Sequence, residues 1–228
     1  MELTDLIRRY TSIASVIDSL RRKQLALLNP DSWDDGNDRH FMELYKQHRG
    51  VSGLYGLCAA QSSETYHHWR VFGGGADGAC LEIKRPRLEK ILSKDPRVRF
   101  GNIEYKLISQ VAKLRKADRD RLPFLKRKPY EPECEYRIIA ETSEPQAPAF
   151  SVPIDLAWIN RVYLNPWLPK SLFQSIKETI REIPGCRSMT VIQTTMLENS
   201  NWKAAGDRLA GVGTAPATVP SIQPTARR

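Results

Sequence analysis

Apolar residues recur at helical spacing in two long stretches of the chain. Near the start they follow an i, i+3, i+4, i+7 pattern, at Ile13, Val16, Ile17 and Leu20. Thr11 or Ser12 stands directly before this stretch, where a hydroxyl can cap the free amides of a helix. Pro169 to Ile183 forms the second amphipathic stretch. Shorter helices are expected over residues 39–48, after Ser62 or Ser63, from Pro86 onward and over residues 107–120.

Short apolar runs between turn residues predict strands. They cover Leu25–Leu28, Gly53–Ala59, Ala79–Ile83, Val98–Tyr105, Glu133–Ile139, Val162–Leu164 and Met189–Met196. Helices and strands follow one another without strict alternation, so the pattern indicates an α+β fold with a mixed sheet and flanking helices. We expect one α+β domain over residues 1–203. Residues 204–228 are dominated by Ala, Gly, Pro, Thr and Arg, and we expect a disordered low-complexity tail there.

Positive charge is concentrated in one segment. The chain has 35 Lys and Arg residues against 26 Asp and Glu, a net charge of +9, and residues 84–128 hold 16 of the bases and five of the acids. A solvated face is one interpretation. Such an asymmetry is also typical of a segment that faces a phosphate-rich partner, and nucleic acid is the partner we expect. The candidate nucleic-acid-binding residues are Lys113, Arg115, Lys116, Arg119, Lys126, Arg127 and Lys128.

Composition excludes several other classes of protein. No apolar run approaches the roughly 18 residues of a membrane helix. The first residues lack the basic and then apolar pattern of a secretory signal, so we expect a cytoplasmic protein with no membrane partner. The four cysteines, Cys58, Cys80, Cys134 and Cys186, lie 22, 54 and 52 residues apart, which predicts reduced, buried thiols and excludes a Cys-rich zinc site.

Two acidic patterns bear on metal binding. The loop from Asp31 to Asp38 looks like a calcium loop, but Trp33 and Met42 stand where oxygen donors are required, and we predict no metal site there. Asp77 followed by Glu82-Ile-Lys84 superficially matches the carboxylates and lysine of metal-dependent nucleases. A nuclease is therefore kept as a third functional hypothesis.

Glu133 and Glu135 form the sharpest candidate site. Residues i and i+2 of a strand face the same side, so both carboxylates are expected to emerge together, with Arg137 in the same row. The row can be a solvated strand face. It can equally be an acid pair in a cleft, where one carboxylate orients a sugar hydroxyl or stabilises developing positive charge.

An aromatic and histidine-rich cluster precedes the glycine-rich turn Gly73–Gly78. It consists of Tyr66, His67, His68, Trp69 and Arg70. Adjacent His67 and His68 point about 100° apart on a helix, so they cannot bind one metal together. Packing or hydrogen bonding is the default role of each histidine, although groups that stack and handle protons at a tight turn also suit a pocket wall.

Three separated motifs together resemble a bacterial family known as domain of unknown function two-nine-seven-one. They are Leu25-Ala-Leu-Leu-Asn-Pro-Asp-Ser-Trp-Asp-Asp35, His68-Trp69 through Gly78-Ala-Cys-Leu-Glu-Ile83, and Tyr130-Glu-Pro-Glu-Cys-Glu-Tyr-Arg-Ile-Ile139. The chain departs from that pattern at Lys128, where an aromatic residue is expected, and in its Asp-Asp-Gly-Asn-Asp loop, which replaces Asn-Asp-Pro. The family label implies no activity.

A second resemblance does imply one. Arg9-Tyr10-Thr11 leading into a helix, with the late Glu133-Cys-Glu135 segment, is similar to ADP-ribosyltransferases, including those that modify nucleic acid. This resemblance implies NAD as the cofactor. It also implies that Glu135 is the catalytic carboxylate, which orients the nicotinamide ribose and stabilises an oxocarbenium-like transition state.

The same resemblance implies roles for other residues. Glu133 would position the acceptor, Arg9 or Arg8 would contact the cofactor phosphates, and Tyr10 would stack on the nicotinamide. The expected cofactor-binding residues are Arg9, Tyr10, Thr11, His67, His68 and Trp69.

We therefore expect an ADP-ribosyltransferase-like fold and an NAD-using bacterial effector, of toxin or phage-defence type, with a nucleic-acid or other phosphate-rich target and a protein partner in such a system. The alternative is a non-catalytic subunit that binds nucleic acid or forms a complex. The transferase hypothesis requires Glu135 in a cleft lined by Arg9 and Tyr10, whereas an open strand face at Glu135 would contradict it.

Overall fold

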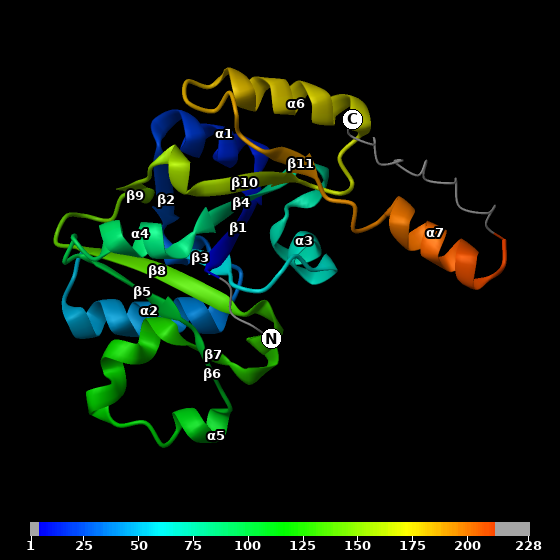
Figure 1. Ribbon diagram of the computed structural model, residues 1–228. Helices are drawn as coiled ribbons and strands as arrows, with labels where there is room; N and C mark the ends of the chain where they lie inside the picture. The colour runs from blue at the N-terminus through cyan, green and yellow to red at the C-terminus, as the bar shows by residue number, and fades with distance from the viewer. Residues whose placement is uncertain (1–4, 213–228) are drawn as a thin grey trace, which may run out of the picture. The chain divides into compact units, whose positions relative to one another are not determined.

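A mixed sheet of nine strands organises the first part of the chain in the computed structural model, which describes residues 5–212 (Figure 1). The strand order is β11-β10-β4-β1-β3-β2-β9, and β8 pairs with both β3 and β5. β10 and β11 are parallel, whereas the other pairs are antiparallel. The predicted α+β class is therefore confirmed. The strands are β1 (Leu6–Ser12), β2 (Gln24–Leu28), β3 (Gly53–Ala60), β4 (Gly78–Lys84), β5 (Val98–Asn102), β8 (Glu135–Thr142), β9 (Ala149–Pro153), β10 (Ile159–Leu164) and β11 (Val191–Gln193).

The sheet splits along one edge of β3. On the other edge, β8 pairs with β3 along its whole length. On the split edge, β1 meets β3 at the pair Arg8–Ala60, and β2 meets it at the pair Leu28–Gly56. Cys58 lies between these two pairs, so β1 and β2 separate at this residue.

Helices cover both faces of the sheet, with α1 and α6 on one side and α2 on the other (Figure 1). α1, α4 and α6 pack into the larger apolar core, and α2 packs into a smaller one. Successive residues of β3 point to opposite cores, since Leu54 belongs to the smaller and Tyr55 to the larger. The helices of this part are α1 (Ile13–Arg22), α2 (Gly36–Arg49), α3 (Tyr66–Phe72), α4 (Arg85–Leu92), α5 (Ile108–Val111) and α6 (Lys170–Glu182).

A separate pair of parallel strands, β6 (Glu104–Lys106) and β7 (Leu125–Arg127), lies outside the main sheet. The helix predicted over residues 107–120 is wrong between these strands, because only α5 and a later 3₁₀ helix form there. Arg115 is extended, and its backbone N–H donates to the Asp118 carboxylate at 2.9 Å, which starts the new 3₁₀ segment.

Two predicted helix starts had different outcomes. α1 begins after Ser12, whose hydroxyl accepts a backbone N–H of the first turn, as predicted. α3 begins after Thr65 and not after Ser62 or Ser63, because the Thr65 hydroxyl accepts the backbone N–H of His68.

The strand predicted from Glu133 also starts later than expected. Glu133 ends the 3₁₀ helix Lys128–Glu133, Cys134 adopts a left-handed conformation with φ 46°, and β8 begins at Glu135. The two glutamates therefore do not project from one strand, and any shared site depends on the turn between them.

The chain divides into two compact units, Met1–Thr194 and Thr195–Arg228. The second unit contains α7 (Ser200–Leu209), which Asn199 caps through its side chain. The predicted disordered tail is therefore wrong at its start, since residues 204–209 are helical. Residues 213–228 of that tail lie outside the described residues. Over residues 5–212, every helix is too short or too polar to span a bilayer.

Candidate active site

Arg9 occupies the gap where β1 and β2 separate. Its Nη1 donates to the carbonyl oxygen of Cys58 at 3.0 Å, in the place where a neighbouring strand would otherwise bond. Burial lowers the pKa of Arg9, yet an arginine side chain stays protonated in proteins. Within residues 5–212, Arg9 forms no ion pair. The gap therefore presents a guanidinium that has N–H groups available for an anion.

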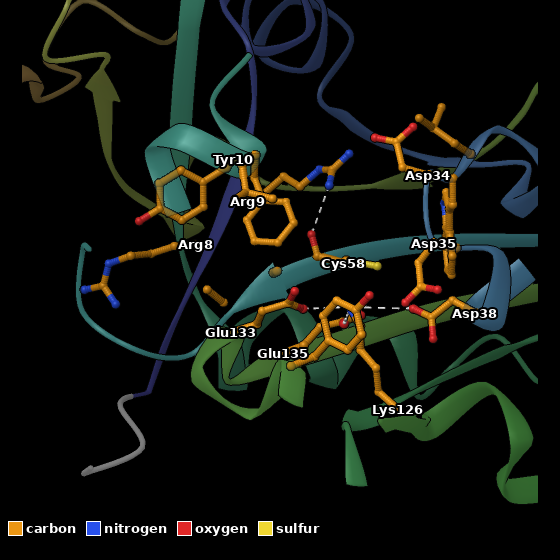
Figure 2. Close-up of a pocket in the computed structure, with 18 of the residues that line it drawn as sticks. Arg8, Arg9, Tyr10, Asp34, Asp35, Asp38, Cys58, Lys126, Glu133 and Glu135 are labelled. Carbon is orange, nitrogen blue, oxygen red and sulfur yellow. Dashed lines mark hydrogen bonds and ion pairs between the residues drawn. The ribbon is translucent and has the colours of Figure 1, made fainter. Parts of the chain in front are cut away.

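A cavity of about 490 Å³ opens beside this gap, a size typical of cofactor sites (Figure 2). The predicted residues Glu133, Glu135, Arg9 and Tyr10 all line it. Its aromatic, acidic and basic lining residues are Tyr10, Trp33, Phe72, Tyr130, Asp34, Asp35, Asp38, Glu133, Glu135, Arg8, Arg9 and Lys126.

Lys126 joins the acidic residues of the cavity (Figure 2). It is the middle residue of β7, and its side chain is only 9% exposed. Its Nζ lies 2.6 Å from Glu133 Oε2, 3.0 Å from Glu135 Oε2 and 3.6 Å from Asp38 Oδ2. The ammonium also lies 4.8 Å from the centre of the Tyr130 ring. A single cation thus brings together residues from α2, β8 and the turn before β8.

Arg137 supports the same cluster from beneath. Its side chain is 1% exposed, and it donates from Nε to Glu135 Oε1 and from Nη2 to Asp38 Oδ2, each at 2.7 Å. Nη1 donates to the carbonyl oxygen of Pro123 at 2.9 Å. Glu135 is therefore fixed by Arg137 on one oxygen and by Lys126 on the other.

The two glutamates have different acidities. Burial raises the pKa of Glu135, but Arg137 and Lys126 outweigh it and bring that pKa down to about 2. Burial raises the pKa of Glu133 above its usual value, and Lys126 only partly offsets this effect. Such a separation typically assigns different roles to two carboxyl groups in one site: Glu135 is an anion at neutral pH, and Glu133 is the better proton acceptor of the two.

Cys58 lines the cavity but does not supply a nucleophile. Burial is the main reason that the pKa of its thiol is raised, and the negative charge of Glu135 adds to the effect. The thiol therefore stays protonated at neutral pH, when a thiolate would be needed for attack.

The predicted cofactor-binding residues of α3 do not line the cavity. The His68 ring stacks on Tyr10 with centroids 5.3 Å apart, and Trp69 meets Tyr10 edge-on at 5.1 Å. Both are buried, whereas His67 is exposed. None of the three lines the cavity, and Phe72 of the same helix lines it instead.

His68 is locked in this position by its ring nitrogens. Nδ1 lies 2.8 Å from the Thr65 hydroxyl, and Nε2 lies 3.2 Å from the carbonyl oxygen of Glu133. Burial lowers the pKa of His68, so the neutral imidazole is favoured. The ring thereby connects Tyr10 to the backbone that carries the acidic cluster.

Thr11 lines a neighbouring cavity of about 320 Å³, which adjoins the first at Arg9 and Leu28. α1 contributes polar side chains to this second cavity, at Ser15, Asp18 and Ser19. Arg9 therefore stands at the junction of an acidic cavity and a hydroxyl-lined one.

Most of the predicted nucleic-acid-binding residues lie on the surface. Within residues 5–212, five of them are exposed and form no ion pair: Lys113, Arg115, Lys116, Arg119 and Arg127. Lys128 is exposed and pairs with Glu131 at 2.6 Å. Lys126 is placed differently from the other six, because the buried carboxylates hold its ammonium in the cavity.

The carboxylate of the nuclease hypothesis is engaged elsewhere. Glu82 is 1% exposed and pairs with Arg8 at 2.6 Å and Arg161 at 3.1 Å. The amide of Asn160 donates to it as well, at 2.5 Å. No cluster of three or more His, Cys, Asp or Glu side chains suited to a metal ion occurs in the described part of the chain.

Sequence reasoning missed Lys126 and Asp38 as residues of the site. Lys126 begins a run of three basic residues, which is typical of a surface. Asp38 belongs to a loop whose acids suggest turn capping, and Asp35 does cap α2 in that way. The spacing of the acids along α2 was the available signal, since Asp35 and Asp38 lie within one helical turn of each other.

The chain matches no protein-family model and no curated protein. The resemblance to domain of unknown function two-nine-seven-one therefore stays an interpretation of three motifs. Solved structures similar to this chain include the DarT protein of Thermus sp. 2.9 in complex with NAD+, which is 12% identical with a TM-score of 0.42 over 83% of this chain and 95% of that one. Its complex with ADP-ribosylated ssDNA is 13% identical, with a TM-score of 0.43 over 83% and 94% of the two chains. Its complex with carba-NAD+ is 12% identical, with a TM-score of 0.42 over 85% and 97%. At this level of similarity, the pocket's own chemistry has to carry the functional assignment.

Proposed function

We propose that this protein binds NAD in the acidic cavity and transfers ADP-ribose to a nucleic-acid acceptor. The observation that carries the proposal is the meeting of Glu135, Arg9 and Tyr10 in one cavity. Glu135 is 5% exposed and faces this cavity, which is the arrangement that the transferase hypothesis requires.

Arg9 is suited to the diphosphate of a dinucleotide. Its guanidinium lies at the junction of the two cavities and has no carboxylate partner within residues 5–212. Arginine binds phosphate oxygens through several N–H groups at once. A diphosphate at Arg9 would place one nucleoside in the cavity with Glu135 and Tyr10, and the other near Thr11 and Ser15.

The acidic cavity suits the nicotinamide end of NAD. Its lining has five acidic residues against three basic ones, and an excess of negative charge favours the positively charged nicotinamide ring. When the bond between C1′ of the ribose and the nicotinamide nitrogen breaks, the electron pair leaves with nicotinamide and the sugar becomes cationic. Glu135 is ionised at neutral pH and stabilises that cation.

The exposed Lys and Arg side chains that form no ion pair within residues 5–212 support a nucleic-acid acceptor. They attract a phosphate backbone irrespective of its sequence. The same residues support the second candidate function, a non-catalytic nucleic-acid-binding subunit, in which the cavity would have no chemical role. An effector role of toxin or phage-defence type, with a protein partner, rests on the family resemblance alone.

The two functions are separated by nicotinamide release from NAD. The purified protein is assayed alone and with single-stranded DNA, duplex DNA or RNA, beside Glu135→Gln. The matched control is Glu131→Gln, which makes the same chemical change at an exposed residue of the adjoining turn. We expect Glu135→Gln to lower the rate by ~100-fold or more and Glu131→Gln to leave it within about twofold. No release by the wild type under any condition would leave only the binding function.

A further inference from the structure

Glu133 depends on Lys126 for its ion pairing. Glu135 and Asp38 each pair with Arg137 as well as with Lys126. Glu133 pairs with Lys126 alone among the described residues, at 2.6 Å. A change at Lys126 therefore affects Glu133 more than the other two carboxylates.

Lys126 also lines a second cavity, on the side of the β6–β7 pair. β7 belongs to the small β6–β7 pair and not to the main sheet. A cavity of about 370 Å³ on that side shares Asp38 and Lys126 with the acidic cavity, and Lys106 and Arg127 also line it. Lys126 thus stands between the acidic cavity and a basic cleft.

We propose that Lys126 is a positioning residue that gives the two glutamates different roles in the reaction. It helps hold Glu135 as the fixed anion beneath the ribose and directs Glu133 to take the acceptor's proton. This inference rests on the proposed function for its reaction, but the contacts that it invokes exist without any ligand.

The reaction step balances with the groups present. The bond between C1′ and the nicotinamide nitrogen breaks, and its electron pair leaves with neutral nicotinamide. A lone pair of the acceptor, an N–H or O–H group, forms the new bond to C1′. The acceptor's proton passes to the Glu133 carboxylate, which later releases it to solvent. With water as the acceptor, the same step is hydrolysis of NAD.

Several groups besides Lys126 interact electrostatically with Glu133. They are Asp38 of α2, Tyr105 of β6, Tyr130 of the preceding 3₁₀ helix and Glu135 of β8. Burial and the nearby anions raise the pKa of Glu133, and Lys126 opposes them. Removal of the lysine should therefore raise that pKa further, whereas removal of a neighbouring anion should lower it.

The test is an NMR titration of the glutamate side-chain carboxyl carbons in the full-length chain without ligand. The Glu133 signal is identified by its loss in Glu133→Gln. Lys126→Met should move the Glu133 midpoint upward by about one pH unit or more, and Lys126→Arg should leave it within about 0.3 unit of the wild type. A midpoint that Lys126→Met leaves unchanged would overturn the proposal.

A second variant covers the case in which Lys126→Met does not fold, as judged by circular dichroism. Asp38→Asn removes one competitor for the ammonium, so the Glu133 midpoint should fall. An unchanged or higher midpoint there would contradict the proposed division.

A kinetic readout separates this inference from the proposed function. Lys126→Met should shift the acid limb of the pH profile of nicotinamide release upward, and it should have no such effect when Glu133 is already Gln. If the wild type releases no nicotinamide, the proposed function fails, and the NMR titration still decides whether Lys126 controls Glu133. If release occurs and neither Lys126→Met nor Glu133→Gln shifts the acid limb of the pH profile, the proposed function stands. Only the role proposed for Lys126 in positioning the two glutamates then fails.

Discussion

Two buried clusters in this protein hold opposite balances of charge. In the cluster around Lys126, three carboxylates share two cations, and every side chain is less than 10% exposed. In the cluster around Glu82, one carboxylate pairs with Arg8 and Arg161, and the Arg161 side chain is 40% exposed. The first cluster keeps an excess negative charge away from bulk water, whereas solvent shields the excess positive charge of the second.

This difference in charge balance distinguishes a candidate binding site from an ion-pair cluster that stabilises the fold. Arg8, Glu82 and Arg161 are neighbours across β1, β4 and β10, so their pairing fastens three strands of the sheet together. The amide of Asn160 and the hydroxyl of Tyr163 complete the bonding of Glu82. The carboxylates around Lys126 instead line a cavity, where their uncompensated charge can act on a bound cation.

Replacement of Arg137 by Met should have the largest effect on stability. Among residues 5–212, Lys126 would then be the only cation paired with these three buried carboxylates. Removal of one partner of a buried ion pair typically costs about 3–5 kcal/mol. Urea unfolding at pH 7 should show this loss, and a loss below about 1 kcal/mol would mean that the cluster tolerates a second unpaired anion.

The acid stability of the protein should depend on Glu135. Its pKa of about 2 lies below the usual value of 4.5, so its contribution is present above pH 4.5 and is lost as the pH falls through 2. The shift corresponds to about 3 kcal/mol of unfolding free energy. Between pH 5 and pH 2, the free energy of unfolding measured with urea should therefore fall in both proteins. The fall should be about 3 kcal/mol smaller in Glu135→Gln than in the wild type. Parallel declines in both proteins would contradict the ion pairs assigned to Glu135.

The part of the site that was predictable from the sequence consists of residues in short local motifs. Arg9 and Tyr10 are adjacent on β1, and Glu135 opens a strand whose alternation is visible in the sequence. These features depend on neighbours within a few residues. Pairing between the strands then brings them together, because β3 joins β1 on one edge and β8 on the other.

The remaining part depends on contacts between distant segments. The ammonium of Lys126 is buried because β7 leaves the main sheet and approaches α2 and the turn before β8. Local sequence describes Lys126 only as the first member of a basic run. The gap at Cys58 is equally non-local, since it requires β1 and β2 to meet β3 at different positions along its length.

Arg9 and Arg8 provide a sharper comparison, since they are adjacent on β1 but differ in their partners. Arg8 pairs with Glu82, whereas Arg9 bonds only to a backbone carbonyl within residues 5–212. On the proposed function, Arg9→Met should weaken NAD binding by ~10–100-fold in calorimetry and leave the fold intact, because a hydrogen bond to a charged group contributes about 1.5–3 kcal/mol. Arg8→Met should instead lower the free energy of unfolding. The comparison would break if Arg8→Met weakened NAD binding without a loss of stability.

The smallest effect is expected from Arg161→Ala, at the open side of the cluster around Glu82. Glu82 would keep Arg8 at 2.6 Å and the Asn160 amide at 2.5 Å, so its carboxylate would remain paired. Because the Arg161 side chain is 40% exposed, its ion pair is partly screened by water, and its loss should cost about 1 kcal/mol or less. The urea midpoint should fall slightly with an unchanged m-value, and Arg161→Lys should lie between Arg161→Ala and the wild type. A loss of about 3 kcal/mol would mean that solvent does not shield this cluster, and the contrast with the cluster around Lys126 would then rest on the sign of the charge alone.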